Sequence, residues 1–184
     1  MLRTLHTFRA AGLLVLGLLA MSLSLSLSTG CGGRQAAPTL ASGKRLAVLV
    51  FLDRTVAPDA PADKVTQLQE VADFMEPDLL AVLRDSGYDA AVASGAPSQV
   101  EGQYTLKVQI TDYNGGSKAA RMFVGFGAGA ARLESHFELI GPNGTSYTQG
   151  SPGSSTSRSS WQRVVRKVNQ EIVAAVNVRL RQGL

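Results

Sequence analysis

The first 31 residues limit which part of this chain can fold into a domain. Arg3 and Arg9 give a positively charged start, and Ala10–Leu27 is an uncharged stretch rich in Leu and Ala. Small residues then lead to Cys31, the one cysteine of the sequence. This is the layout of a secretory signal peptide, which is removed from the mature protein. We therefore predict that residues 1–30 are a signal peptide and that the other 154 of the 184 residues hold the folded part.

The end of the apolar stretch, Leu27-Ser28-Thr29-Gly30-Cys31, resembles the lipobox of bacterial lipoproteins. The resemblance implies that Cys31 becomes an acylated N-terminus carrying palmitate or similar chains, and two or more such chains hold a protein stably on a membrane. Because Gly32 is not a retention residue, it also implies the outer membrane, with the protein facing the periplasm. Two alternatives stay open: an ordinary secretory signal, or an uncleaved membrane helix over Ala10–Leu27, near the lower length limit of about 20 residues.

Length and composition predict one domain on a tether. Residues 31–43 are rich in Gly, Ala, Ser and Pro and lack hydrophobic periodicity, so we expect a lipidated flexible tether. Residues 44–184 have the length of one ordinary domain. Loss of Arg3 and Arg9 lowers the net charge from +4 to +2, so the basic balance is no argument for nucleic acid, and we expect no nucleic-acid partner.

The mature chain has little material for the common catalytic or metal sites. Its only cysteine is used by the lipid, and His136 is its only histidine, so neither a zinc site nor a Ser-His-Asp triad is expected. Four carboxylates, Asp53, Asp112, Glu134 and Glu138, lie near predicted strands, but a solvated sheet face explains them. We therefore predict no enzymatic activity, no cofactor and no metal.

Apolar periodicity predicts a sheet. Leu46–Leu52 is a short apolar run that fits a buried inner strand, and Tyr88–Ala93 fits a short second strand. In Tyr104–Tyr113, apolar and polar residues alternate, which indicates a strand with one buried face. Leu133–Ile140 and Thr145–Gln149, joined by a Pro-Asn-Gly turn, complete an antiparallel meander with that strand.

The first helical region is predicted over residues 63–86, where apolar residues recur three and four apart. Asp63 is expected to cap its start, and Gly87 to end it. Pro77 removes one backbone hydrogen bond, so we expect a kink or a break near Phe74 to Glu76.

The last predicted helix follows a polar loop over Ser151–Ser160. Ser159 and Gln162 form a capping-box pattern at its start. An apolar stripe from Trp161 to Leu180 is expected to pack on the sheet, opposite a basic face. We expect that face to be solvated, and contact with anionic lipid or an acidic partner is the alternative.

Together these elements predict an α/β protein of the α+β kind. We expect a single domain with a mainly antiparallel sheet of about four or five strands, packed by the two helical regions. Charge is uneven along it: residues 53–101 hold ten acidic and three basic side chains, whereas residues 102–184 hold ten basic and four acidic ones. One end should therefore be negative and the other positive.

The glycine segment, residues 115–133, is the most unusual stretch of the domain. Its glycines follow the spacing G-x-G-x-G and a strand comes next, which does not fit a dinucleotide or phosphate-binding loop. They permit a hairpin, a bulge or a close backbone approach. Alternatively the segment is an apolar contact loop for a membrane or another subunit. The candidate contact residues are Arg121, Phe123, Gly125, Phe126, Gly127 and Gly129.

At this segment the chain resembles the bacterial lipoprotein family of DUF4410, a domain of unknown function. The resemblance rests on Ile110–Tyr113, on Gly116–Arg121 and on Gly125–Gly129, and it extends over about Lys44 to Leu180. The family has no established activity, so the resemblance implies a fold and a compartment. More distantly, the chain resembles periplasmic domains of lipoproteins related to curli secretion channels and the N-terminal domain of the Tol-system propeller protein, which act through protein contacts.

These observations favour a non-enzymatic, lipid-anchored envelope protein that faces the periplasm and serves as an interaction or assembly module. Its expected partners are the membrane, through the acyl groups on Cys31, and an envelope protein or further copies of itself. The alternative is a periplasmic carrier lipoprotein for a small ligand or a lipid, which requires a concave apolar cavity.

Overall fold

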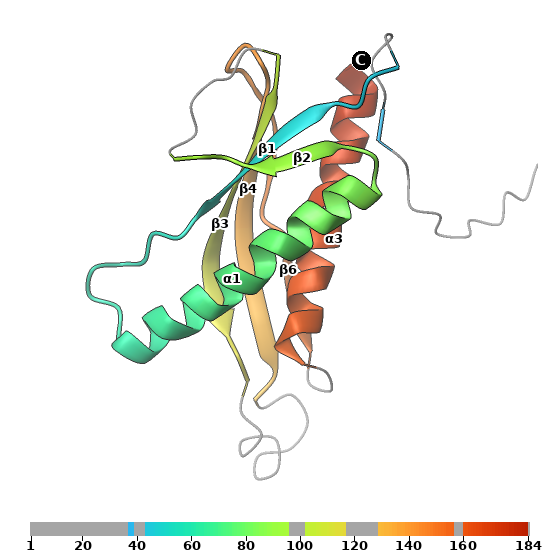
Figure 1. The fold of residues 1–184 in the computed structure, drawn as a ribbon. Coiled ribbons are helices and arrows are strands. Elements are labelled where there is room, and N and C mark those ends of the chain that lie inside the picture. The colour runs from blue at the N-terminus through green and yellow to red at the C-terminus, as the bar shows by residue number, and fades with distance from the viewer. Residues whose placement is uncertain (1–36, 39–42, 96–101, 117–128, 157–159, 184) are drawn as a thin grey trace, which may run out of the picture. The chain divides into compact units, whose positions relative to one another are not determined.

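The computed structural model of the protein describes residues 37–38, 43–95, 102–116, 129–156 and 160–183. These belong to one unit, Arg34–Leu184. In chain order its elements are β1 (Ala47–Asp53), α1 (Ala62–Asp85), β2 (Asp89–Val92), β3 (Tyr104–Asn114), β4 (Ala131–Ile140), β5 (Ser146–Gly150), β6 (Gly153–Thr156) and α3 (Trp161–Gly183). The strands form a six-stranded sheet and the two helices pack on it (Figure 1).

The sheet is mixed, with the strand order β2-β1-β3-β4-β5 and with β6 also paired to β4. Strand β1 runs parallel to both β2 and β3, while β4 is antiparallel to β3, β5 and β6. The predicted inner position of the first strand and the β3-β4-β5 meander are therefore confirmed. The single α+β domain is confirmed too, with a sheet that has one strand more than the four or five expected.

The sixth strand, β6, corrects the prediction of a polar loop over Ser151–Ser160. Strands β5 and β6 follow one another along the same edge of β4. Between them the carbonyl oxygen of Pro152 accepts a hydrogen bond from the Ser135 backbone N–H at 3.1 Å. Because proline has no N–H to donate to the sheet, the edge strand is interrupted at Pro152. The residues after Pro152 are small and polar, so no alternation of apolar residues in the sequence indicated a strand there.

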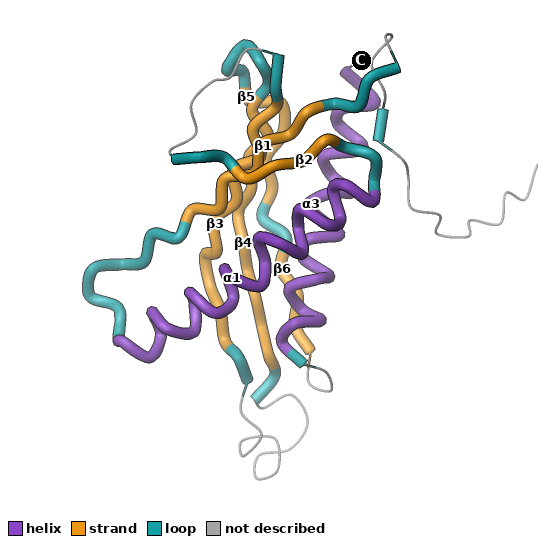
Figure 2. The backbone as a smooth tube through the Cα atoms, viewed as in Figure 1, coloured by secondary structure: helices purple, strands orange, loops and turns teal. Residues whose placement is uncertain are grey.

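Both helices cover the same face of the sheet (Figure 2). In β1 the side chains of Val48 and Val50 are buried beneath them, while Leu49 and Phe51 point to the opposite face and are half-buried. The stripe predicted for the last helix is the buried stripe of α3, including Val165, Val168, Ile172, Val176 and Leu180. None of the described helices is long and apolar enough to cross a membrane.

Helix α1 is continuous through Pro77, so of the predicted kink or break near Phe74 to Glu76 the break is excluded. Pro77 is exposed, which leaves the carbonyl group that lost its partner on the solvent side. The start also differs from the prediction, because Pro61 is the N-cap and Asp63 lies in the first turn without a capping side-chain hydrogen bond. The predicted end is confirmed: Gly87 has φ +101°, and the Tyr88 N–H donates to the Leu83 carbonyl at 3.1 Å, a Schellman motif.

Helices α1 and α3 also pack against each other. Phe74 meets Trp161 edge to face at 5.3 Å between ring centroids, and Arg166 lies 3.5 Å from Asp78. Asn169, which is fully buried, donates to the Met75 carbonyl at 3.1 Å. The acidic first half and the basic second half of the sequence thus meet where these two helices pack, as the pair of Arg166 with Asp78 shows.

The sheet has two distinct ends. Strands β1 and β3 are parallel and in register near their starts, with Val48 opposite Tyr104, so both begin at one end. The described chain joins the domain there, because the Ala37 N–H donates to the Ser86 carbonyl at 2.5 Å and the Asp89 N–H donates to the Leu46 carbonyl at 2.9 Å. We call this the tether end, and the other end, where β3 finishes and β4 begins, the stem end. The 11 residues of β3 separate the two by about 30 Å.

Candidate functional site

Residues 117–128 of the glycine segment are joined to the domain by a two-stranded stem. The stem is formed by residues 112–116 at the end of β3 and residues 129–134 at the start of β4. Asn114 lies opposite Arg132, and Asp112 lies opposite Glu134. The register shifts between Ile110 and Asp112, which makes a β-bulge at this point of β3. The bulge adds one residue, and it therefore places Asp112 on the sheet face away from the helices.

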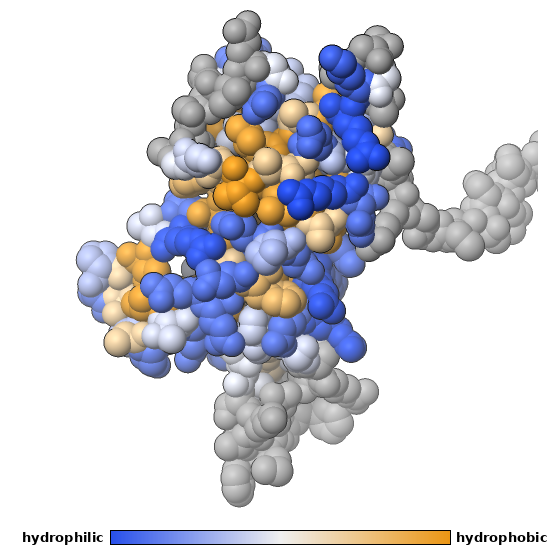
Figure 3. Space-filling view, viewed as in Figure 1, coloured by the Kyte–Doolittle hydropathy of each residue, from blue (hydrophilic) through white to orange (hydrophobic). Residues whose placement is uncertain are grey.

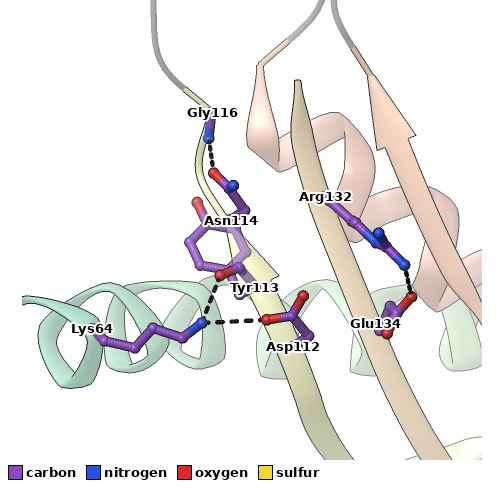
Figure 4. Close-up of polar contacts among 7 residues, drawn as sticks. All are labelled: Lys64, Asp112, Tyr113, Asn114, Gly116, Arg132 and Glu134. Atoms are coloured by element: carbon purple, nitrogen blue, oxygen red, sulfur yellow. Dashed lines mark hydrogen bonds and ion pairs between the residues drawn. The ribbon is translucent and has the colours of Figure 1, made fainter. Parts of the chain in front are cut away.

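Two cations hold the facing carboxylates of the stem (Figure 4). Like charges directly opposite each other on neighbouring strands are destabilising. The Lys64 ammonium, in the first turns of α1, lies 3.2 Å from Asp112 Oδ1 and donates to the Tyr113 carbonyl at 3.3 Å. Arg132 pairs with Glu134, and the hydrogen bond that Glu134 accepts raises the pKa of Arg132. Asp112 is thus neutralised by a lysine of α1, and Glu134 by an arginine of its own strand, β4.

The neck of the stem is closed by glycines. Gly116 has φ +76° and Gly129 has φ +70°, backbone conformations that L side chains rarely adopt. The Gly116 N–H donates to the Asn114 side-chain oxygen at 2.9 Å. A Cβ on Gly116 would come within 2.6 Å of the Gly129 carbonyl oxygen and 2.9 Å of the Ala131 nitrogen. The two backbones are therefore in direct contact where residues 117–128 begin and end.

Aromatic packing fastens the stem to both helices. Tyr113 is buried and meets Trp161 of α3 at 6.4 Å between ring centroids, and Trp161 in turn meets Phe74 of α1. Burial, with a smaller contribution from the charge of Glu70, raises the pKa of Tyr113. The stem is therefore a fixed part of the core.

Beside the stem, the open face of the sheet is polar. Gln109 lies opposite His136 and Lys107 lies opposite Glu138, while His136 Nδ1 is 3.2 Å from Ser151 Oγ. Glu134, His136 and Glu138 all lie on this face of β4. An open groove of about 650 Å³ runs next to the stem, lined by Arg132, Glu134, Ser151, Gly153, Ser154 and Ser155.

A second, small hollow, of about 20 Å³, lies beyond the carboxyl end of β1. Its lining includes Asp53, Thr55, Leu68 and Ile110. Hydrogen bonds from the side chain and backbone of Thr55 lower the pKa of Asp53. The neighbouring Arg54 is turned onto α1, where it pairs with Asp73 and Glu76.

Most of the predicted site residues lie outside the described residues, namely Cys31, Arg121, Phe123, Gly125, Phe126 and Gly127. Gly129 is described, and its positive φ agrees with the predicted role of the glycines in close backbone approach. The sequence gave no pairing for Lys64, Asp112, Arg132 and Glu134, which the structure brings together at the stem. Among the described residues, no three Asp, Glu or His side chains converge as they would around a metal ion.

Comparison with known proteins gives one family, and the distant solved structures that match the chain include the following two. The model of a family described as a domain of unknown function, DUF4410, matches residues 35–179. A PelC dodecamer from Paraburkholderia phytofirmans is 21% identical with a TM-score of 0.48, and the match covers 76% of this chain and 93% of that chain. An uncharacterized protein is 16% identical with a TM-score of 0.35, over 81% of this chain and 96% of its own. No curated protein matches the chain.

Proposed function

The chain belongs to the DUF4410 family, and on that premise we propose that it is a non-enzymatic, lipid-anchored envelope protein that works as a periplasm-facing interaction or assembly module. One observation carries the proposal. The stem of the glycine segment and the point where the chain from Cys31 joins the domain lie at opposite ends of the sheet. A domain anchored at one end presents the glycine segment at the other.

The sequence left two contacts open for the glycine segment, a membrane or another subunit, and this geometry helps to choose between them. The segment begins about 30 Å from the tether end, given the 11 residues of β3. A protein partner in the periplasm therefore fits this position better than the membrane that holds the anchor. Phe123 and Phe126 are the aromatic side chains of the segment, and aromatic residues commonly supply the binding energy of an interface.

The stem suits a contact site because it is rigid and its charges are internally paired. Tyr113 and Trp161 fasten it to the core, and Lys64 and Arg132 compensate Asp112 and Glu134. Binding loops are generally carried by such a fixed scaffold, which limits the entropy lost on association. The polar groove beside the stem adds hydroxyl and charged groups for the rim of an interface.

Site-specific photo-cross-linking in cells tests the proposal. A photoreactive residue at Phe126 should give a discrete cross-link to a protein. The same residue at Glu171, an exposed position in the middle of α3, is the matched control and should give none. Equal cross-linking from both positions, or none from Phe126, would contradict a contact at the glycine segment.

The anchor is tested separately by metabolic labelling with an alkyne palmitate. The wild-type protein should carry the label and sediment with outer-membrane vesicles, whereas Cys31→Ala should lose the label. A label that persists in Cys31→Ala would show that Cys31 is not the acylated residue.

The carrier alternative has one observation in its favour, the hollow beyond β1. It lies at the carboxyl end of a strand with parallel neighbours on both sides, where open α/β sheets commonly bind ligands. The space enclosed there, about 20 Å³, is far below the roughly 300 Å³ of pockets that hold small molecules, which counts against a carrier. Native mass spectrometry of the detergent-extracted protein distinguishes the two functions, since a carrier retains a small molecule of constant mass.

A further inference from the structure

The tether end carries an excess of basic side chains. It is formed by the residues just before β1 (44–46), by the chain from the last turn of α1 to the start of β2 (84–89) and by the last turn of α3 (179–183). Five basic side chains and two acidic ones belong to these segments, and all seven are exposed. The residues are Lys44, Arg45, Arg84, Arg179 and Arg181, with Asp85 and Asp89. Strongly hydrophilic side chains gather at this corner, whereas apolar ones lie over β1 and β2 (Figure 3).

Contacts within the fold hold these segments together. The Asp89 N–H donates to the Leu46 carbonyl, which joins the starts of β1 and β2. Buried Tyr88 donates to Asn177 Oδ1 at 2.5 Å, which joins the end of α3 to them. Two of the cations are also oriented: Arg84 donates to the Ala90 carbonyl at 2.8 and 3.0 Å, and Arg179 lies over the Tyr147 ring at 5.8 Å.

The length of the chain ties this basic end to the acylated cysteine. Ala37 is hydrogen-bonded to Ser86 and would be 3.6 Å from a Cβ on Gly87, so it lies on the tether end. Six peptide steps separate it from Cys31. Even a fully extended chain of this length spans at most about 20 Å. Acyl chains on Cys31 would therefore hold the tether end within about 20 Å of the lipid headgroups.

Resting on the lipid anchor of the proposed function, we propose that the tether end docks on the anionic phospholipid headgroups of the leaflet that holds the anchor. Clusters of Lys and Arg next to a membrane anchor are attracted to anionic lipid, and the attraction adds to the hydrophobic anchor. At the stem, by contrast, basic and acidic side chains balance, since Lys64 and Arg132 face Asp112 and Glu134. Docking at the tether end orients the domain with its stem toward the periplasm.

Fluorescence quenching on the full, lipidated protein tests this orientation. Cys31 is the one cysteine of the sequence, so a second cysteine can be labelled selectively once Cys31 is acylated. Gln182→Cys places an environment-sensitive fluorophore at the tether end, and Thr111→Cys, also exposed, places it near the stem. Each protein is reconstituted in vesicles of brominated phosphatidylcholine, with or without phosphatidylglycerol.

The proposal expects quenching of the Gln182→Cys label that rises at least twofold when phosphatidylglycerol is present, and little quenching of the Thr111→Cys label in either vesicle. Lys44→Glu combined with Arg45→Glu should remove the rise, as should high salt, which screens exposed charges. Equal quenching in both vesicles, or stronger quenching at Thr111→Cys, would overturn it. Co-flotation separates the two failures: protein that does not float lacks the anchor, whereas protein that floats without this pattern is anchored but not oriented.

Discussion

Gly116 lies so close to Gly129 that a Cβ on Gly116 would come within 2.6 Å of the Gly129 carbonyl oxygen. This contact closes the neck from which the glycine segment emerges. Gly116→Ala meets backbone atoms that cannot swing aside, and it also forces alanine to φ +76°. We expect the free energy of unfolding to fall by about 3 kcal/mol, from backbone strain and overpacking together, as measured by urea denaturation.

Gly102→Ala is the matched control for this substitution. Gly102 has φ +77°, but among the described residues no atom beyond its chain neighbours lies within 4 Å of its added Cβ. It should therefore show the backbone strain alone, about 1 kcal/mol. Equal losses for the two variants would mean that the close approach at the neck contributes nothing.

The ion pair between Lys64 and Asp112 should show a small, salt-dependent coupling. Both side chains are about half exposed, so a double-mutant cycle with Lys64→Met and Asp112→Asn should give about 0.5 kcal/mol at low ionic strength. The coupling should shrink in high salt. Lys64→Met alone should cost more than Lys167→Met, because Asp112 faces Glu134 directly, whereas Lys167 lies 3.9 Å from Glu171 on one helix. A coupling energy of zero at low salt would show that this ion pair does not stabilise the stem.

Ionisation of the buried Tyr88 hydroxyl should destabilise the protein at alkaline pH. Burial raises the pKa of Tyr88 to about 12, from its ordinary value of 10.0. A raised pKa means that the folded state holds the proton more tightly, so this contribution is complete below pH 10 and is lost as the pH rises toward 12. A shift of about two units corresponds to about 2 to 3 kcal/mol. In a spectrophotometric titration, Tyr88→Phe should remove the tyrosinate that forms last; an unchanged last step would contradict the assignment.

Asn169 should tolerate alanine better than aspartate. Its amide nitrogen donates to the Met75 carbonyl at 3.1 Å and to Asp78 Oδ2 at 2.9 Å, while its buried oxygen has no hydrogen-bond partner in the part of the chain that the structure describes. Asn169→Asp places a carboxylate in this acceptor-lined position, and at neutral pH it should cost about 3 kcal/mol or more.

The pH dependence distinguishes the two variants of Asn169. The introduced carboxylic acid favours its protonated form when buried, so part of the stability of Asn169→Asp should return as the pH falls. Asn169→Ala should lose about 1 to 3 kcal/mol at any pH, because it only removes the hydrogen bonds. Denaturant melts between neutral and mildly acidic pH measure both, and parallel losses at every pH would contradict the expectation.

The sequence predicted the elements of this fold better than their pairing. The alternation in Tyr104–Tyr113 and the apolar stripe of the last helix each follow from one buried face, so local periodicity was sufficient. The position of Asp112 opposite Glu134 depends instead on the bulge, which shifts the strand register by one residue. The buried apolar residues of β3 have even numbers up to Val108, whereas the next fully buried one, Tyr113, has an odd number. This change in the alternation was a signal of the bulge.

Other features depended on contacts between distant parts of the chain. Strand β6 consists of small polar residues, and only its position beside β4 makes it a strand. The continuity of α1 through Pro77 follows from the exposure of that side of the helix, which sequence alone did not determine. The pairing of Lys64 with Asp112 joins residues 48 positions apart.

The central claim is that an anchored domain contacts a partner through its glycine segment, and the native mass of the lipidated protein in mild detergent tests it most directly. The wild-type protein should run as a defined complex, with the same companions or the same copy number in each preparation. Phe126→Ser should reduce it to a monomer while its far-ultraviolet circular dichroism stays unchanged. A wild-type protein that is already a monomer with no protein companion would contradict the account.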